Sequence, residues 1–360
     1  MTSASYAAEE VLGSDDIWTG VGRVIDRAPS LAHLRRHRLH LLAAHRWRSL
    51  GRPLPPELAD DERRAAMAAL AVPILLERVR AGCDDPVIVF KGPEVAARYP
   101  NPALRDFVDL DILVPDAAQA QRSLIEAGFR EFGDPELYVD IHHLRPLFSA
   151  PLQLRVEVHS APKWLDELEP PPASELFSGA VPSATGVEGI LALPPAQHAV
   201  VLAVHSWAHE PLARLGHLVD IAAILDGTDR NAAAEIAGAW GVRSLWDTTL
   251  DVADAVFLGR RGRAGVLNVW ARHLRAARER TVFEHHVERW MSGFWALPAG
   301  KAARQTAEEL WWDIRPTPGE SWRRKLSRTG RAFRDAFVPR SEHDRALGPE
   351  ASRRRDRPSV

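Results

Sequence analysis

Two carboxylates in an otherwise apolar run constrain this chain more than any other feature. Asp109 and Asp111 stand in the segment 105–114, RDFVDLDILV, which reads as one strand. Because alternate side chains of a strand share a face, both acids point the same way while Leu110 and Ile112 point into a core. Neighbouring carboxylates raise each other's pKa unless a cation neutralises them. Oxygen ligands favour Mg²⁺ or Mn²⁺, so phosphoryl-type chemistry is the leading hypothesis. The alternative is a solvated strand face, since this spacing is common.

Composition and charge narrow the class of protein. The 360 residues are 46% hydrophobic and 26% charged, which predicts a globular protein with a sizeable core. The formal net charge of -2 argues against a long nucleic acid as partner. The single cysteine, Cys83, excludes an intramolecular disulfide. The first residues lack a secretory pattern and no apolar run could span a bilayer, so we expect a cytoplasmic protein without a membrane span.

Hydrophobic periodicity divides the chain into four parts. These are an N-terminal helical segment (1–82), an α+β core (83–190), a helical bundle (191–315), and a basic amphipathic helix with a disordered tail (316–360). In the core, the order strand, helix, strand, helix, strand, strand predicts a small mixed sheet with helices on one face. The other three strands of this core are expected at residues 87–90, 138–144 and 153–159, with 146–151 as a connection and 161–190 as irregular cover.

The helices follow from apolar residues at helical spacing. They are predicted at residues 31–50, 60–80, 94–99, 116–127, 196–225, 231–237, 243–258, 265–290, 301–312 and 322–337. Asp116 is expected to cap the helix that it begins, with Gly128 just past its end, and Gly238 is expected to close a later helix. The basic tail is expected to be solvated, with binding to RNA, to a membrane surface or to a partner as the alternatives.

The order of these motifs resembles a known family. Lys91-Gly92 ends the first strand, the D-x-D strand follows four residues after Arg105, and a later strand, VEVH at 156–159, carries Glu157. This order resembles the uncharacterised nucleotidyltransferase family of the polymerase-β-like nucleotidyltransferase superfamily, over roughly residues 60–260. The helical residues 205–209 and 218–221 are similar to the C-terminal bundle of that family.

The resemblance implies a reaction and a set of catalytic residues. It implies transfer of a nucleoside monophosphate from an NTP to an acceptor with release of pyrophosphate, supported by Mg²⁺ or Mn²⁺. Asp109, Asp111 and Glu157 would be the catalytic metal ligands, and Glu157 would also act as base. The acceptor stays open: a small molecule, a peptide, a protein or a tRNA end. One alternative is an inactive module of this fold that binds a nucleotide or a partner protein; another is a histidine-site metallohydrolase in the helical part.

Three residues are predicted to bind the triphosphate. Gly92 would let the backbone approach a phosphate, Lys91 would place a charge on it, and Arg105 would fork onto it. The alternatives are an ion pair of Lys91 with Asp109 or Glu94, and one of Arg105 with Asp106. The superfamily has Gly-Ser where this chain has Lys91-Gly92, so how the triphosphate is held stays open.

Three histidines are predicted to contact the substrate. His143 and His159 lie near the ends of the later strands, and His205 lies on the long helix. A buried histidine bonded to the backbone is the alternative for His159. His205 and His209 have a spacing that can bind zinc, but Ser206 stands where a metalloprotease has glutamate, so we favour packing and lining of a cleft.

Overall fold

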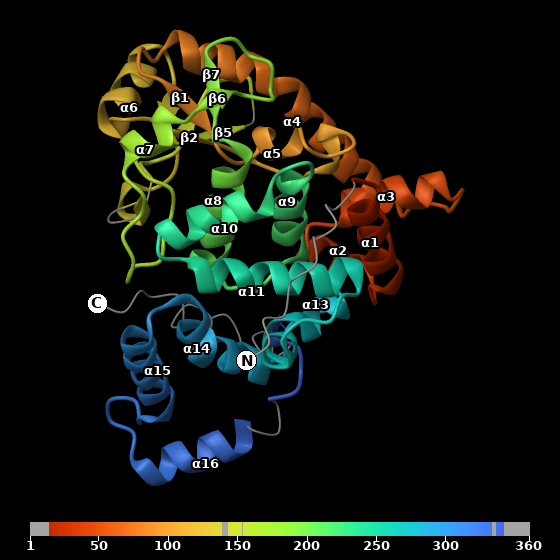
Figure 1. The fold of residues 1–360 in the computed structure, drawn as a ribbon, viewed down its shortest axis with the longest axis vertical. Coiled ribbons are helices and arrows are strands. Elements are labelled where there is room, and N and C mark those ends of the chain that lie inside the picture. Colours follow the sequence, from red (N-terminus) through yellow and green to blue (C-terminus); the bar gives the residue numbers. More distant parts are fainter. Residues whose placement is uncertain (1–13, 139–142, 153, 333–335, 342–360) are drawn as a thin grey trace, which may run out of the picture.

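The computed structural model describes residues 14–138, 143–152, 154–332 and 336–341. The sheet lies at one end of the molecule and the C-terminal helices lie at the other (Figure 1). The N-terminal helices are α1 (Ser14–Arg27), α2 (Leu31–Arg36), α3 (His40–Ser49) and α4 (Pro56–Ala81). The helices between strands are α5 (Pro93–Ala96), α6 (Ala117–Glu126) and α7 (Ala173–Ser178). The later helices are α8 (Pro195–His209), α9 (Leu215–Leu225), α10 (Arg230–Ala239), α11 (Arg243–Ala253), α12 (Ala264–Val266), α13 (Arg272–Arg275), α14 (Val282–Ala296), α15 (Ala299–Ile314) and α16 (Trp322–Ala332).

Within the part of the chain that the structure describes, seven strands form one mixed sheet in the order β3-β4-β5-β2-β1-β7-β6. The strands are β1 (Val87–Val89), β2 (Asp109–Leu113), β3 (Arg130–Glu131), β4 (Leu147–Phe148), β5 (Arg155–His159), β6 (Val181–Pro182) and β7 (Ile190–Ala192). The central strand β2 runs antiparallel to β1 and parallel to β5. The mixed sheet with its helices confirms the predicted α+β class.

The two faces of β2 have different surroundings because its side chains alternate. Leu110 and Ile112 pack in a cluster with α4 and α6. Leu113 belongs to the opposite cluster, which the sheet forms with α8, α9 and the other helices. Asp109 and Asp111 share the face of Leu113, so the carboxylates are directed toward the helical part of the molecule rather than into the core under α4 and α6.

Helix α8 is the central element of the helical part. Every residue from His198 to Trp207 is buried, as expected for a helix surrounded by others. α9 packs beside it, and α10 and α11 cover it on the side away from the sheet (Figure 1). This arrangement lays α8 and α9 against the face of the sheet that carries the acids.

Several boundaries of the sheet differ from the prediction. The strand predicted at 138–144 falls partly on residues 139–142, which lie outside the described residues. The strand that pairs antiparallel with β5 is β4, which lies inside the predicted connection at 146–151. The segment 161–190, predicted to be irregular, contains α7 and β6, and β7 reaches Ala192. These strands are two or three residues long, and such short strands carry too few alternating residues to show a period of two.

Several predicted helices are interrupted. The helix predicted at 31–50 is divided into α2 and α3 by Arg38, which has a positive φ of 56°. The one predicted at 196–225 is divided into α8 and α9 around Leu212, with φ 48°. The one predicted at 265–290 breaks near Ala277, with φ 46°. Gly238 lies inside α10 rather than closing it, and the left-handed glycine after that helix is Gly241, with φ 71°. Apolar periodicity continues across such single-residue breaks, which is why the predicted helices are too long.

One predicted cap is confirmed, and part of the tail is ordered. The carboxylate of Asp116 accepts a hydrogen bond from the backbone N–H of Gln119 at 2.9 Å, and Gly128 follows α6 with φ 97°. Near the C-terminus, Pro339 pairs with Thr281 as a β-bridge. The prediction of disorder from about 339 is therefore wrong for residues 339–341, and residues 342–360 lie outside the described residues. None of the described helices is both long and apolar enough to cross a membrane.

The buried histidine His198 predicts a dependence of stability on pH. Its Nε2 atom lies 2.6 Å from the carbonyl oxygen of Phe90, and burial lowers its pKa from 6.5 to about 4. The unfolded chain therefore binds a proton between these values that the folded chain does not. The contribution of His198 to the free energy of unfolding is full above pH 6.5 and is lost as the pH falls toward 4.

We expect His198→Gln to reduce the slope of unfolding free energy against pH in this window by up to about 1.4 kcal/mol per pH unit. The glutamine amide can still donate to Phe90. Urea unfolding over this pH window measures the slope, and the exposed His45→Gln on α3 is the control, with an unchanged slope. An unchanged slope in His198→Gln would contradict the assignment.

Candidate active site

The register between β2 and β5 places two acids side by side. Asp111 is opposite Glu157, and Asp109 is opposite Arg155, in a parallel pairing. Residues in register on neighbouring strands point to the same face, and neighbouring strands lie about 4.8 Å apart. The acid on the later strand is therefore brought to the D-x-D pair by the sheet itself.

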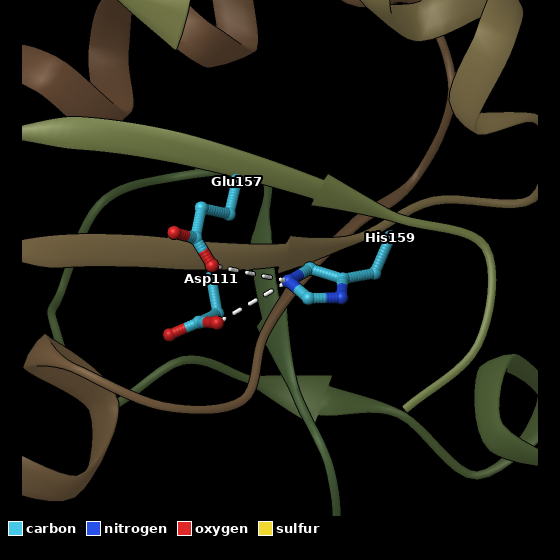
Figure 2. Close-up of side chains that lie close together, drawn as sticks. All are labelled: Asp111, Glu157 and His159. Atoms are coloured by element: carbon cyan, nitrogen blue, oxygen red, sulfur yellow. Dashed lines mark hydrogen bonds and ion pairs between the residues drawn. The ribbon is translucent and has the colours of Figure 1, made fainter. Parts of the chain in front are cut away.

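A histidine completes this group of side chains. His159 lies two residues after Glu157 on β5 and shares its face, and its Nε2 atom is 3.2 Å from Asp111 Oδ1 and 4.0 Å from Glu157 Oε2. Figure 2 shows the imidazole turned toward both carboxylates. One ligand atom from each of the three side chains lies within 4.8 Å of the others. Asp109 is not a member of this close group.

Lys91, at the end of β1, supplies the cation nearest to the acids. Its Nζ atom lies 2.8 Å from Asp111 Oδ1 and 3.2 Å from His205 Nε2 on α8. The alternatives weighed for Lys91, an ion pair with Asp109 or with Glu94, are both wrong. Glu94 is buried elsewhere and accepts a hydrogen bond from the Ser183 hydroxyl at 2.5 Å.

The three carboxylates have different electrostatic surroundings. Burial opposes the charged form of Asp111, but Lys91 and His159 outweigh burial and hold the pKa of Asp111 well below its usual range. Burial and the charges of Asp111 and Asp109 raise the pKa of Glu157 to about 7. Burial and Asp111 also raise the pKa of Asp109. Lys91 therefore stabilises the charged form of Asp111, whereas the charged forms of Asp109 and Glu157 are not stabilised to the same extent.

The donor set fits a divalent cation. Among the described residues, Asp111 Oδ2 is buried without a hydrogen-bond partner. A buried, unsatisfied carboxylate oxygen beside a second carboxylate is costly unless a cation binds it. The oxygens of Asp111 and Glu157 suit Mg²⁺ or Mn²⁺, whereas an imidazole nitrogen such as that of His159 is more typical of zinc, iron or copper sites.

The acids open into a cavity of about 480 Å³ between the sheet and α8–α9. This volume is in the range of small-molecule sites. The cavity is lined by Arg38, Lys91, Gly92, Arg105, Phe107, Asp109, Asp111, His143, Glu157, Leu202, His205, Ser206, His209, Glu210, Ala213, Arg214, His217 and Asp220. Asp109, Asp111 and Glu157 thus converge on one cavity beside Lys91-Gly92, although the sequence separates Glu157 from Asp109 by a helix and two strands.

The three predicted substrate histidines occupy different positions. His143 and His205 line the cavity, and His143 Nε2 lies 3.7 Å from Glu157 Oε2. His159 is fully buried behind Asp111 and does not line the cavity, so this position does not fit the predicted contact with a substrate. The ring of His209 lies 4.5 Å from that of His205, and its Nδ1 atom is 3.0 Å from Lys163 Nζ. His205 and His209 therefore both line the cavity, as expected for residues of a cleft wall.

Arg105 forms a buried ion pair that the sequence did not reveal. Its Nε and one terminal nitrogen bond the two carboxylate oxygens of Asp220 at 2.8 and 2.9 Å. A third nitrogen donates to the carbonyl oxygen of Gly92 at 3.1 Å, and the Tyr99 hydroxyl also donates to Asp220. The proposed alternative partner, Asp106, is wrong; it lies 3.9 Å from His40. Arg105 thus ties α9 to the Lys91-Gly92 turn.

Gly92 is required by its backbone conformation and by the closeness of β2. Its φ is +54°, and a Cβ atom there would lie 2.8 Å from the carbonyl oxygen of Asp109. α5, which follows, has only four residues. Gly92 therefore brings β1 and the D-x-D strand into close contact, and a phosphate contact remains a prediction.

Sequence reasoning missed several residues of the cavity wall, among them Asp220, Arg38 and Arg214. Asp220 stands in a segment already similar to the family bundle, and its charge inside the apolar run LVDIAAIL was the available signal. Arg38 and Arg214 carry no such signal, because each is one of many arginines outside the core motifs.

With this geometry in place, the chain can be assigned to a class. A family model described as "Uncharacterised nucleotidyltransferase" matches residues 25–257, well over half of the chain. The protein therefore belongs to this family, as the motif order predicted. No curated protein and no solved structure matches the chain. The matched region begins before α2 and ends within the helical part, so it contains the sheet and the whole cavity wall.

Gly92→Ala should lower the free energy of unfolding by about 2 kcal/mol or more, since the left-handed conformation costs a residue with Cβ about 1–2 kcal/mol and Asp109 must also shift. Urea unfolding measures the change. Gly300→Ala, on α15 with open space around it, is the control and should be neutral or stabilising. An unchanged stability of Gly92→Ala would show that β1 and β2 are less closely packed than the structure shows.

Arg105→Met should lower the free energy of unfolding by about 3–5 kcal/mol, because Asp220 would remain buried without its cation. Asp220→Asn should destabilise in the same way, and the double variant should lose less than the sum of the two single losses. Denaturant unfolding of the four proteins gives the coupling energy. If Arg105→Met unfolds like the wild type but loses affinity for NTP, Arg105 is a phosphate ligand instead.

Proposed function

We propose that the protein is a Mg²⁺- or Mn²⁺-dependent nucleotidyltransferase that transfers a nucleoside monophosphate from an NTP to a hydroxyl or phosphate of an acceptor, releasing pyrophosphate. The observation that carries the proposal is the pairing of Asp111 with Glu157 beside Asp109, with a buried Asp111 oxygen that lacks a hydrogen-bond partner among the described residues. Membership of a nucleotidyltransferase family supports the reaction class.

Asp111, Glu157 and the nearby Asp109 would hold the metal, which when bound supplies charge neutralisation at the reacting phosphate. In the transfer to a hydroxyl, the acceptor oxygen forms a bond to the α-phosphorus while the bond from the α-phosphorus to the bridging oxygen of pyrophosphate breaks. The hydroxyl proton passes to a base. Glu157 would be this base, because it lies on the cavity opposite Asp111 and, with no cation bound, burial and the neighbouring acids raise its pKa to about 7.

Other residues of the site hold the acids in place. His159, buried behind Asp111, and Lys91 both approach Asp111 Oδ1 and fix its orientation. His143 stands on the cavity side of Glu157 and is placed to contact a substrate or to orient that carboxylate. A cavity of about 480 Å³ accommodates part of a nucleotide and leaves the acceptor's class open: a small molecule, a peptide, a protein or a tRNA end.

One observation favours a second function, a non-catalytic module that binds a nucleotide or a partner. The Lys91 ammonium lies 2.8 Å from Asp111 and neutralises it without a metal ion. A module that had lost catalysis would keep such a pair. The two functions differ in turnover rather than in fold.

Calorimetric titration with each NTP in the presence of Mg²⁺ or Mn²⁺ tests both functions. The wild type should bind an NTP more tightly with metal than without it, and Asp109→Ala/Asp111→Ala should abolish this metal-dependent part, because the cation loses its oxygen ligands. Asp84→Ala/Asp85→Ala, a pair of acids outside the cavity, removes the same charge and should bind like the wild type.

The outcomes separate the hypotheses. Absence of metal-dependent NTP binding in the wild type would contradict the proposal. Binding without release of pyrophosphate, assayed with candidate acceptors of each class, would favour the non-catalytic module. Release of pyrophosphate that requires Asp109 and Asp111 would establish transfer.

A further inference from the structure

Four lysine or arginine side chains line the cavity, and two of them differ from the rest. Lys91 pairs with Asp111, and Arg105 pairs with Asp220. Across the residues that the structure describes, the guanidinium groups of Arg38 and Arg214 make neither an ion pair nor a hydrogen bond, although both line the same cavity. The cavity therefore carries acids on the sheet side and two unpaired cations on the helical side.

Arg38 and Arg214 are brought together by contacts between the α2–α3 connection and the start of α9. The backbone N–H of Gly216 donates to the carbonyl oxygen of His37 at 2.9 Å, and the N–H of Leu215 approaches His37 Nδ1 at 3.3 Å. Gly216 is required there, because a Cβ atom would lie 3.0 Å from Arg38 Cβ. Arg214 immediately precedes α9. Figure 1 shows α2 next to α9, far from it in the sequence.

The backbone of Arg38 is unfavourable for an arginine. It follows the end of α2 with a φ of 56°, a left-handed position that glycine usually occupies after a helix. A residue with a Cβ atom is held in this conformation only by its surroundings, and such positions cluster at functional sites. The Arg38 side chain, which this unfavourable backbone conformation carries, lines the cavity.

The electrostatics of this wall also favour an anion. Burial lowers the pKa of the Arg214 guanidinium, and the charge of Arg38 lowers it further, so the two cations repel each other. The charge of Arg38 also partly offsets the rise in the pKa of Asp109 that burial and Asp111 cause, so Arg38 lies within electrostatic range of that acid. The first backbone N–H groups of α9 donate to His37 and are not available to a ligand. The guanidinium groups of Arg38 and Arg214 therefore supply the positive charge of this wall.

We propose that Arg38 and Arg214 bind the β- and γ-phosphates of the nucleoside triphosphate, the part that leaves as pyrophosphate. This inference rests on the proposed function. It answers how a triphosphate is held in a chain with Lys91-Gly92 in place of Gly-Ser, where Lys91 is committed to Asp111 and α5 is too short to form an anion site. Guanidinium groups match phosphate oxygens with paired hydrogen bonds.

Tripolyphosphate without metal is the direct probe, and calorimetry at physiological ionic strength measures its affinity. Arg38→Gly and Arg214→Gln should each weaken tripolyphosphate binding by about 10-fold or more, and should weaken NTP binding in the presence of metal similarly. Arg323→Gln on α16, which does not line the cavity, removes the same charge and should bind like the wild type. Mn²⁺ binding should be unchanged in all three variants.

Arg38→Gly keeps the test independent of folding. Glycine relieves the left-handed backbone, so the melting temperature should be unchanged or raised while tripolyphosphate affinity falls. Equal tripolyphosphate affinity in Arg38→Gly, Arg214→Gln and the wild type would overturn the inference, even if metal-dependent NTP binding persists and supports the proposed function. Equal affinity of the wild type for inorganic phosphate and tripolyphosphate would also overturn it, because the site would then hold a single phosphate.

The proposed function fails separately from the inference. If the wild type binds tripolyphosphate through Arg38 and Arg214 but binds no NTP with metal, the two arginines form a polyphosphate site and the transferase proposal falls. If the wild type binds neither ligand, both proposals fall.

Discussion

The parallel pairing of β2 with β5 is the constraint on which the rest of the site depends. It places Asp111 opposite Glu157 and directs both carboxylates, with Asp109, to one face of the sheet. The other face of β2 carries Leu110 and Ile112 into the core under α4 and α6, and that burial fixes the register. A shift of one residue would turn the acids into the core and the aliphatic side chains into the cavity. The hydrophobic core and the charged cavity are therefore two results of the same alternation.

Concentrating negative charge in a half-buried place has consequences for the neighbouring elements. The end of β1 contributes Lys91, β5 contributes His159, and both approach the same oxygen of Asp111. The charge of Lys91 does not suffice for Glu157, because burial and the neighbouring acids raise the pKa of Glu157 to about 7. The remaining deficit is what a divalent cation would fill. With no cation bound, the site thus combines an acid whose pKa is held low, Asp111, with one whose pKa lies near neutrality, Glu157.

A second charged network holds the helical wall in place. Arg105, Asp220 and Tyr99 join the turn before β2 to α9, and Arg105 also bonds the carbonyl oxygen of Gly92. α9 begins against the connection between α2 and α3. The N-terminal helices therefore help to form the cavity, which agrees with a family match that starts at residue 25. The proposed division into four parts describes the order of elements along the chain, whereas the cavity is built from three of those parts.

The sequence predicted the acids well and their surroundings poorly. Asp109, Asp111, Glu157 and Lys91 lie on or beside strands with apolar runs, and such local patterns are visible in one dimension. The ion pair of Arg105 with Asp220 spans more than a hundred residues, so Asp106, the neighbour in sequence, looked like a suitable partner. The short strands β4, β6 and β7 were missed because their pairing depends on strands that are already in place. The breaks at Arg38 and Leu212 were missed because apolar spacing continues across them.

By itself, the sequence determined which residues alternate on β2, that three carboxylates and a lysine belong to one α+β core, and to which family the motif order belongs. Only the tertiary structure decided that His159 supports Asp111 from behind, that Arg105 is held by Asp220, and that Arg38 and Arg214 face the acids across a cavity. The physical reason is the distance along the chain over which each interaction acts. Strand alternation and helix capping act over a few residues, whereas the partner of a charge is set by the packing of elements that are distant in the chain.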